Sequence, residues 1–123
     1  MPNKTVDQLV EEARTTLDRV EPLDAHAAVE AGEALLVDIR AESQREADGV
    51  VPGAQFIPRN VIEWRAERLT TGKRVVVMCD GGYQSSLVAA TLQELGLEDA
   101  TDLAGGFQAW RGAELPVEPL RSS

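Results

Sequence analysis

The stretch that decides the fold is residues 75–90, VVVMCDGGYQSSLVAA. It opens with an unbroken apolar run rich in β-branched side chains, which is typical of a short, fully buried strand. From Ser85 onward the sequence is typical of a helix start, because Ser85 or Ser86 can cap the helix and Leu87 and Val88 begin its apolar face. The sequence therefore predicts a strand, a tight loop and a helix N-terminus in immediate succession.

The loop between strand and helix holds the only cysteine of the chain, Cys79, and two adjacent glycines, Gly81 and Gly82. Backbone N–H groups in a tight glycine loop and at a helix N-terminus bind anions, and they stabilise a thiolate in the same way. This arrangement indicates a cysteine that acts as a nucleophile or carries sulfur. The alternative is a buried, inert cysteine at the end of a strand.

The length and composition predict one soluble globular domain. With 123 residues, of which 43% are hydrophobic, the chain can bury one core and has no room for a second domain. No apolar run approaches the roughly 20 residues that a membrane helix requires, and no secretory signal is visible at the N-terminus. A lone thiol fits a reducing compartment, so we expect a cytoplasmic protein.

The charge balance argues against two classes of partner and against a metal site. The net charge is −9, from 21 acidic and 12 basic residues. Nucleic acids and anionic membranes bind basic surfaces, so we expect neither as a partner. With one cysteine and one histidine, any metal site would depend on carboxylates, and no cluster has the spacing of zinc ligands.

A second buried strand is predicted at residues 34–38, ALLVD. The carboxyl ends of parallel strands are where functional groups gather, and this strand brings Asp38 and Arg40 to that position. They are candidates for a supporting role beside the cysteine. The alternative is an ion pair that ties neighbouring loops together.

The remaining segments alternate between helix and strand. An amphipathic helix is expected from Lys4 to Val20, where apolar residues recur at helical spacing, and it serves either for packing or as a partner surface. Asp24 and Asn60 are expected to cap two later helices. The further helical segments are 25–31, 41–48, 60–69, 85–95 and 105–110, and the further strands are 54–57 and 100–103. This alternation through short loops predicts an α/β domain with a largely parallel sheet.

Four segments resemble the motifs of single-domain rhodaneses, which are sulfurtransferases that carry sulfur as a cysteine persulfide. Residues 35–40, LLVDIR, look like the family's strand ending in Asp-Val-Arg, and residues 49–54, GVVPGA, are similar to its Gly-His-Ile-Pro-Gly-Ala. The loop from 79 to 85 and the late segment 103–110, LAGGFQAW, complete the set in the family's order. The resemblance, which covers about 23–117, implies a rhodanese-like three-layer domain with a central, mostly parallel sheet and helices on both faces.

The resemblance also implies a division of the chain and a set of roles. Residues 1–20 are then an N-terminal amphipathic helix, 21–118 the rhodanese-like domain and 119–123 a flexible tail. Cys79 is the expected nucleophile, and no cofactor is needed. A small sulfur donor or a persulfidated protein supplies the sulfur, and a thiol or cyanide accepts it. Asp38 and Arg40 are expected behind the site, and the substrate-binding residues are Asp80, Gly81, Gly82, Tyr83, Gln84 and Ser85.

The loop departs from the family pattern in ways that bear on the donor. Where the family often has an arginine just before its Ser or Thr, this chain has Gln84, and Asp80 adds a carboxylate next to Cys79. Thiosulfate is a dianion, so we expect weak use of it, while persulfide chemistry itself is unaffected. The histidine usual in the second motif is Val50 here, so no role for that side chain carries over.

Two other functions are considered for this fold class. Phosphatases and arsenate reductases of similar fold have an arginine six positions after the cysteine, where this chain has Ser85, so the guanidinium that clamps an oxyanion is missing. The other alternative is a non-enzymatic binding or redox-sensing module, in which Cys79 takes no part in sulfur transfer.

Overall fold

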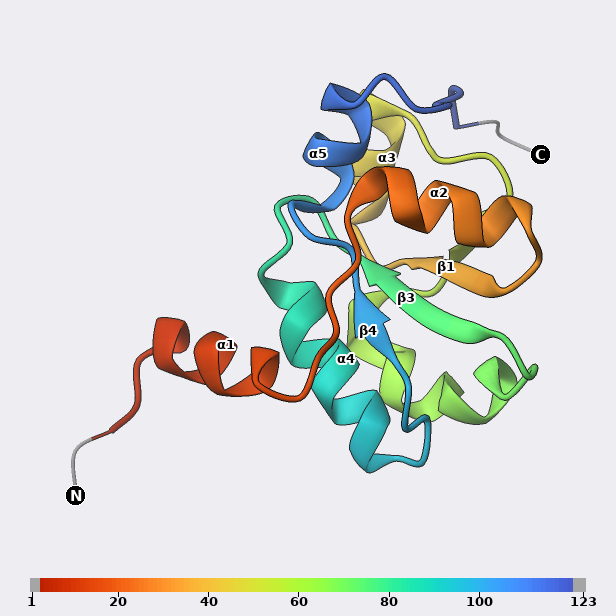
Figure 1. Ribbon diagram of the computed structural model, residues 1–123. Helices are drawn as coiled ribbons and strands as arrows, with labels where there is room; N and C mark the ends of the chain where they lie inside the picture. The colour runs from red at the N-terminus through yellow and green to blue at the C-terminus, as the bar shows by residue number, and fades with distance from the viewer. Residues whose placement is uncertain (1–2, 121–123) are drawn as a thin grey trace.

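The computed structural model of the protein describes residues 3–120, and its centre is a four-stranded sheet in the order β2-β1-β3-β4 (Figure 1). The strands are β1 (Ala34–Asp38), β2 (Gln55–Phe56), β3 (Arg74–Met78) and β4 (Thr101–Asp102), and all neighbours are parallel. β1 and β3 pair along their whole length, with Asp38 opposite Met78 at their carboxyl ends. The segments that follow these two strands therefore leave the sheet at the same edge.

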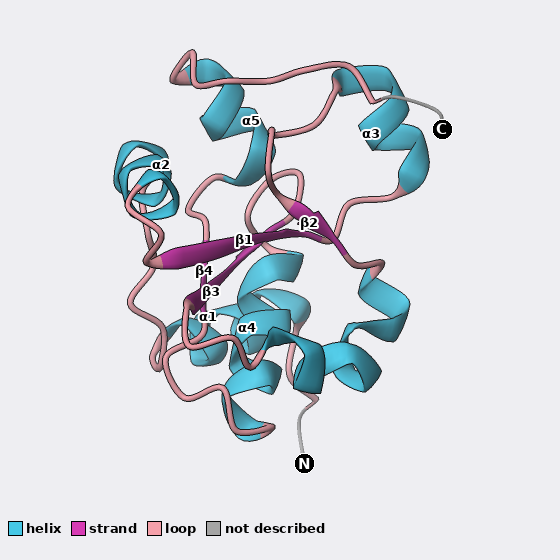
Figure 2. Ribbon diagram, turned by 90° about the vertical axis from the view of Figure 1, so that its right-hand side faces the viewer, coloured by secondary structure: helices cyan, strands magenta, loops and turns pink. Residues whose placement is uncertain are grey.

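The helices lie on both faces of the sheet, which confirms the predicted α/β class and its three layers. Figure 2 shows α2, α3 and α5 on one side of the sheet and α1 and α4 on the other. The 3-10 helix η1 packs with α4 in one hydrophobic cluster. Their bounds are α1 (Val6–Arg14), α2 (Pro22–Glu30), α3 (Glu42–Asp48), η1 (Arg59–Leu69), α4 (Gln84–Glu94) and α5 (Gly106–Gly112).

The central strand β3 sends alternate side chains into two separate cores, as the pleat of a strand requires. Val75, Val77 and Cys79 face the cluster that contains α4 and η1, while Val76 and Met78 face the cluster that contains α2 and α5. None of these five residues is more than 5% exposed. Helices on both faces explain the unbroken apolar run, since such a strand has no solvent-facing side.

The N-terminal helix is shorter than the predicted Lys4–Val20, because α1 ends at Arg14. The hydroxyls of Thr15 and Thr16 donate to backbone carbonyls three residues earlier, at 2.6 and 3.0 Å. Such local side-chain bonds compete with the helical hydrogen-bond pattern and favour its end. The amphipathic pattern beyond Arg14 belongs to a non-helical segment.

That segment runs along the edge strand β4. The backbone N–H of Val20 donates to the carbonyl of Asp102 at 3.0 Å, and the N–H of Ala104 donates to the carbonyl of Val20 at 2.9 Å. These two bonds attach the segment to the sheet. Arg19, immediately before Val20, is thereby brought to the carboxyl end of β4.

Two predicted helix caps are wrong. α2 begins at Pro22, whose fixed φ suits the first helical turn, so Asp24 lies inside the helix. The helical segment predicted from Asn60 begins one residue earlier, after Pro58, and is a 3-10 helix without a side-chain cap.

Near the C-terminus, the backbones of Val50 and Glu118 exchange two hydrogen bonds, of 2.7 and 2.8 Å. The chain is thus attached to the domain as far as residue 118. The predicted domain boundaries, between residues 20 and 21 and between 118 and 119, stay predictions. Residues 121–123 of the predicted tail lie outside the described residues. Between residues 3 and 120, no helix is both long and apolar enough to cross a membrane.

Candidate functional site

Cys79 lies in a loop that closes around its own sulfur. The backbone N–H groups of Gly82 and Ser85 donate to Sγ at 3.1 and 3.4 Å, and the Ser85 Oγ lies 3.3 Å from Sγ. The cysteine is only 5% exposed. Fixed N–H dipoles that converge on a sulfur stabilise negative charge there without any rearrangement of the protein.

A cavity of about 250 Å³ opens beside this sulfur. The cavity is lined by the Cys79 loop, which follows β3, and by the segment that follows β1. These two segments meet because β1 and β3 are paired in parallel and end side by side. Tyr83 stands at its rim with 62% of its surface exposed. The lining residues are Arg40, Gln44, Cys79, Asp80, Gly81, Tyr83 and Gln84.

The residues predicted to bind substrate divide into two groups. Asp80, Gly81, Tyr83 and Gln84 line the cavity, whereas Gly82 and Ser85 contact the sulfur itself. Gln44 was not expected at the cavity. Gln44 lies in α3, a polar stretch of sequence that contains no motif. Only the packing of α3 near the carboxyl ends of the strands brings this side chain to the cavity.

Arg40 is buried next to the cavity, and only part of its guanidinium has hydrogen-bond partners. Its Nη2 donates to Asp38 Oδ2 at 2.9 Å and to the Gly49 carbonyl at 2.8 Å, and its guanidinium lies 3.8 Å above the centre of the Phe107 ring. The ion pair considered from the sequence is therefore present. The Nη1 atom is buried and has no hydrogen-bond partner within residues 3–120. The Arg40 side chain is 0% exposed, so its guanidinium lies behind the cavity surface rather than in it.

The first turn of α5 holds the beginning of the loop. The Phe107 N–H donates to the Cys79 carbonyl at 2.8 Å, and the Gln108 N–H donates to the Asp80 carbonyl at 3.1 Å. Gln108 Nε2 also donates to Asp80 Oδ1 at 2.9 Å. The carboxylate that the sequence placed beside Cys79 is therefore engaged by an amide from another element.

Two glycines permit this close contact between α5 and the loop. Gly106 has φ +62°, and a Cβ there would lie 2.5 Å from the Cys79 carbonyl oxygen. Gly82 has φ +88°, and a Cβ there would lie 2.8 Å from the backbone nitrogen of Gly105. L side chains rarely adopt such φ values, and these distances leave them no room. The late Gly-Gly motif and the Cys79 loop are parts of one site.

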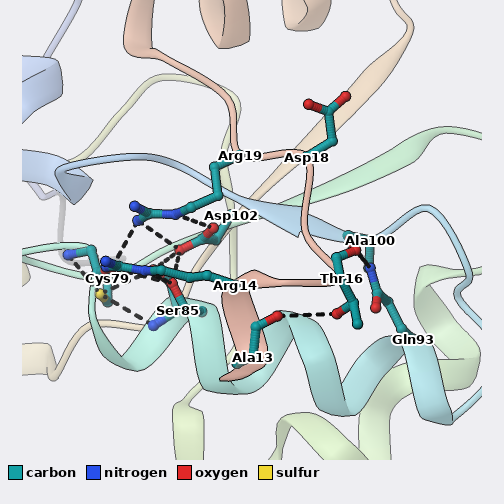
Figure 3. A network of polar contacts seen from close by, with 12 residues as sticks. Ala13, Arg14, Thr16, Asp18, Arg19, Cys79, Ser85, Gln93, Ala100 and Asp102 are labelled. Carbon is teal, nitrogen blue, oxygen red and sulfur yellow. Dashed lines mark hydrogen bonds and ion pairs between the residues drawn. The ribbon is translucent and has the colours of Figure 1, made fainter. Parts of the chain in front are cut away.

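Ser85 and Ser86 do not cap α4 as predicted, because their hydroxyls bond elsewhere. α4 begins at Gln84 without a side-chain cap. The Ser85 hydroxyl donates to Asp102 Oδ2 at 2.8 Å (Figure 3), and the Ser86 hydroxyl donates to the same oxygen at 2.8 Å. Asp102 is fully buried, and a buried carboxylate requires hydrogen-bond donors. Sequence reasoning missed Asp102; its position at the carboxyl end of the last strand was the available signal.

Two arginines that precede the predicted domain complete the network, as Figure 3 shows. Arg19 donates from Nε to Asp102 Oδ1 at 2.9 Å and from Nη2 to the Gly82 carbonyl at 2.9 Å. Arg14 donates from Nε to Ser86 Oγ at 3.0 Å and from Nη2 to the same Gly82 carbonyl at 2.8 Å. Neither arginine lies in a motif, and more than 60 residues separate each from Gly82, so the sequence offered no signal for either.

The polar groups of this site suit an anionic sulfur. Backbone N–H groups contact Cys79, two amide side chains line the cavity, and the one carboxylate at the cavity, Asp80, accepts a hydrogen bond from Gln108. In the described part of the chain, no group of three or more His, Cys, Asp or Glu side chains is arranged to hold a metal ion. The arrangement can hold a thiolate or a persulfide and admit a small molecule to it.

The comparison with known sequences connects this site to a family. The family of rhodanese-like domains matches residues 21–113. A sulfurtransferase from Allochromatium vinosum is 34% identical over 83 residues, which cover 68% of this chain and 77% of that protein. The thiosulfate sulfurtransferase GlpE of Stutzerimonas stutzeri is 31% identical over 97 residues, which cover 79% of this chain and 87% of that protein.

Solved structures with the same fold include one of similar length. A protein of unknown function from Rhodopseudomonas palustris, described as a possible tyrosine phosphatase, has a TM-score of 0.84 and 30% identity, and the match covers 96% of this chain and 99% of that one. A thiosulfate sulfurtransferase from Pseudomonas aeruginosa has a TM-score of 0.69 and 28% identity, and the match covers 84% of this chain and 19% of that one.

Proposed function

Because the chain belongs to the family of rhodanese-like domains, we propose that it is a sulfurtransferase that carries a sulfane sulfur as a persulfide on Cys79. The observation that carries the proposal is the surroundings of the Cys79 sulfur. Two backbone N–H groups, from Gly82 and Ser85, point at Sγ, and a cavity of about 250 Å³ is open beside it. An inert buried cysteine would need neither feature.

The proposed reaction has two displacements at sulfur. The Cys79 thiolate attacks the outer sulfur of a donor such as thiosulfate; the new S–S bond forms as the donor's S–S bond breaks, and sulfite leaves with the bonding electron pair. Cys79 is then a persulfide anion. In the second step, cyanide or an acceptor thiolate attacks the outer sulfur of the persulfide. The S–S bond breaks, the Cys79 thiolate leaves with the bonding electron pair, and the product is thiocyanate or a new persulfide. Charge and electrons balance in both steps, so no cofactor is required.

The residues around the cavity have proposed roles in these steps. The N–H groups of the loop stabilise the thiolate and the persulfide as preorganised dipoles. Asp80, Gly81, Tyr83 and Gln84 contact the donor from the cavity wall. Arg40 supports the site from behind the cavity: its buried guanidinium pairs with Asp38, which also lies 3.5 Å from Arg45 Nε. A small donor or a persulfidated protein fits this opening, and the lone thiol is consistent with the reducing cytoplasm.

The test of this function follows the sulfur atom. Wild-type protein exposed to a sulfane donor should gain the mass of one sulfur, and cyanide should remove it as thiocyanate. Cys79→Ser should fold normally, since it replaces one atom, and should show neither reaction. Wild type alkylated at Cys79 is the matched control and should be equally inactive. A Cys79→Ser variant with wild-type turnover would remove Cys79 from the mechanism. Wild type that takes up no sulfur would favour the non-enzymatic binding or redox-sensing module.

The Rhodopseudomonas palustris relative makes phosphate ester hydrolysis the second function to test. Such chemistry needs a guanidinium to clamp the oxyanion, and the position six residues after the cysteine is Ser85, whose hydroxyl is bonded to Asp102 at 2.8 Å. We expect no saturable hydrolysis of p-nitrophenyl phosphate and no reduction of arsenate. Saturable hydrolysis that disappears in Cys79→Ser would replace sulfur transfer with phosphatase activity.

A further inference from the structure

The buried side of the Cys79 loop has a positive charge that comes from outside the family domain. Arg14 and Arg19 both precede residues 21–113, and both contact the network behind the loop (Figure 3). Among residues 3–120, the only carboxylate that this network bonds is Asp102, so two guanidinium charges face one negative charge. The Arg19 side chain is 22% exposed and that of Asp102 is fully buried, so solvent ions screen these charges weakly.

One path from the arginines to the sulfur runs through the backbone. The Gly82 carbonyl accepts a hydrogen bond from each guanidinium, at 2.8 and 2.9 Å. The N–H of the same residue, Gly82, donates to Sγ at 3.1 Å. The two arginines therefore hold a residue that itself contacts the sulfur, and they help to fix the N–H groups of the loop in the orientation in which they point at Sγ.

A second path runs through side chains. Arg19 donates twice to Asp102, and Asp102 accepts the hydroxyl of Ser85, whose Oγ lies 3.3 Å from Sγ. When Cys79 is a thiol, it can donate to this Oγ. When Cys79 is an anion, the Ser85 hydroxyl can turn and donate to the sulfur instead. Asp102 tolerates this change because Arg19 and Ser86 still donate to it.

We propose that Arg14 and Arg19 are positioning residues that stabilise the anionic sulfur of Cys79. They supply, from behind the loop, the positive charge that Gln84 does not supply from within it. The inference deepens the proposed function, on which its persulfide part rests. Stabilisation of the free thiolate does not depend on sulfur transfer, and it can therefore be tested separately.

The main test uses Arg14→Gln and the rate of Cys79 alkylation against pH. This change leaves no partner unsatisfied, since Ser86 Oγ still donates to Asp102 and the Gly82 carbonyl still accepts from Arg19. We expect the midpoint of the rate profile to rise by about half a pH unit, which is about a threefold lower thiolate fraction below the midpoint. The matched control is Lys4→Gln, which removes a cation just before the same helix whose one hydrogen-bond partner among the described residues is Glu12. Its midpoint should equal that of wild type.

Two conservative variants separate this role from simple anchoring. Arg14→Lys and Arg19→Lys keep the charge but lose the forked geometry, so their midpoints should lie between those of wild type and Arg14→Gln. Thermal unfolding is measured for every variant. If Arg14→Gln unfolds at a lower temperature but keeps the wild-type midpoint, the arginines only anchor the N-terminal segment and the inference is wrong. If Arg14→Gln does not fold, Arg14→Met, which keeps the apolar stem and removes the charge, takes its place, and a wild-type midpoint in it would overturn the inference.

A second readout distinguishes failure of this inference from failure of the proposed function. If the protein is a sulfurtransferase, Arg14→Gln should lower kcat for thiosulfate by about threefold. The Arg14 guanidinium lies 5.4 Å from the centre of the Tyr83 ring, which lines the cavity, so a change in KM would report displacement of that ring and not a change at the sulfur. An alkylation shift in a protein that takes up no sulfur would support the arginines and reject the sulfurtransferase. An unshifted alkylation profile in a protein that does transfer sulfur would support the sulfurtransferase and reject the role of the arginines.

Discussion

Gln84 is exposed, lines the cavity, and offers a neutral amide where a guanidinium would attract an anionic donor. A charge-assisted hydrogen bond exceeds a neutral one by about 1 kcal/mol, and each 1.4 kcal/mol is about tenfold in affinity. Gln84→Arg should therefore lower KM for thiosulfate by several-fold to about tenfold. Steady-state thiosulfate kinetics at low ionic strength measure this effect.

The control for that substitution introduces the same charge elsewhere. Gln55 is also exposed but does not line the cavity, so Gln55→Arg should leave KM nearly unchanged. The advantage of Gln84→Arg should shrink at high salt because it is largely Coulombic. An unchanged KM for Gln84→Arg at low salt would mean that this side chain does not meet the donor.

At the level of secondary-structure elements, the site depends on the contact between α5 and the Cys79 loop. Gly106→Ala should break this contact, since the new methyl group would lie 2.5 Å from the Cys79 carbonyl oxygen and 2.6 Å from that of Asp80, at a residue with φ +62°. We expect a loss of about 2 to 4 kcal/mol in the free energy of unfolding, from backbone strain and overpacking together. Urea unfolding measures it.

Gly112→Ala is the matched control, because it makes the same change in the same helix. A Cβ at Gly112 would meet nothing within 4 Å. Where the backbone conformation is compatible, replacing Gly by Ala stabilises a protein by about 0.4–1 kcal/mol. Equal stabilities of Gly106→Ala and Gly112→Ala would contradict the close packing of α5 on the loop, and so would full sulfur transfer by Gly106→Ala.

At the level of the whole molecule, the net charge of −9 bears on how an anionic donor approaches. The molecule repels a dianion such as thiosulfate at long range, and added salt screens this repulsion. For wild type, kcat/KM for thiosulfate should therefore rise several-fold as ionic strength increases from about 0.01 to 0.15 M, over which the Debye length falls from about 30 to 8 Å. An inert salt such as potassium chloride is used for the titration.

An uncharged trisulfide is the control donor, and its kcat/KM should not change with salt, because the net charge of the protein exerts no long-range force on it. A thiosulfate rate that falls with salt would show instead that local positive charge near the cavity dominates the approach of the donor. Wild type and Gln84→Arg should then have salt dependences of the same sign.

The sequence by itself determined the features that depend on local pattern. The apolar run before Cys79 predicted β3, because burial on both faces permits no polar position, and Gly81 and Gly82 marked the loop after it. Since β1 and β3 were predicted as parallel strands, Asp38, Arg40 and Cys79 were expected at one edge, and Arg40 and Cys79 do line one cavity. The α/β class followed from the same alternation of elements.

Only the tertiary structure decided which distant side chains complete the site. Ser85 and Ser86 have the sequence position of helix caps, yet the buried carboxylate of Asp102 takes both hydroxyls. Arg14 and Arg19 lie in a segment whose apolar spacing resembles a longer helix, yet its attachment to β4 brings their guanidiniums to the Gly82 carbonyl. Local patterns record which face of an element is buried, whereas the choice among hydrogen-bond partners depends on which elements the fold packs together.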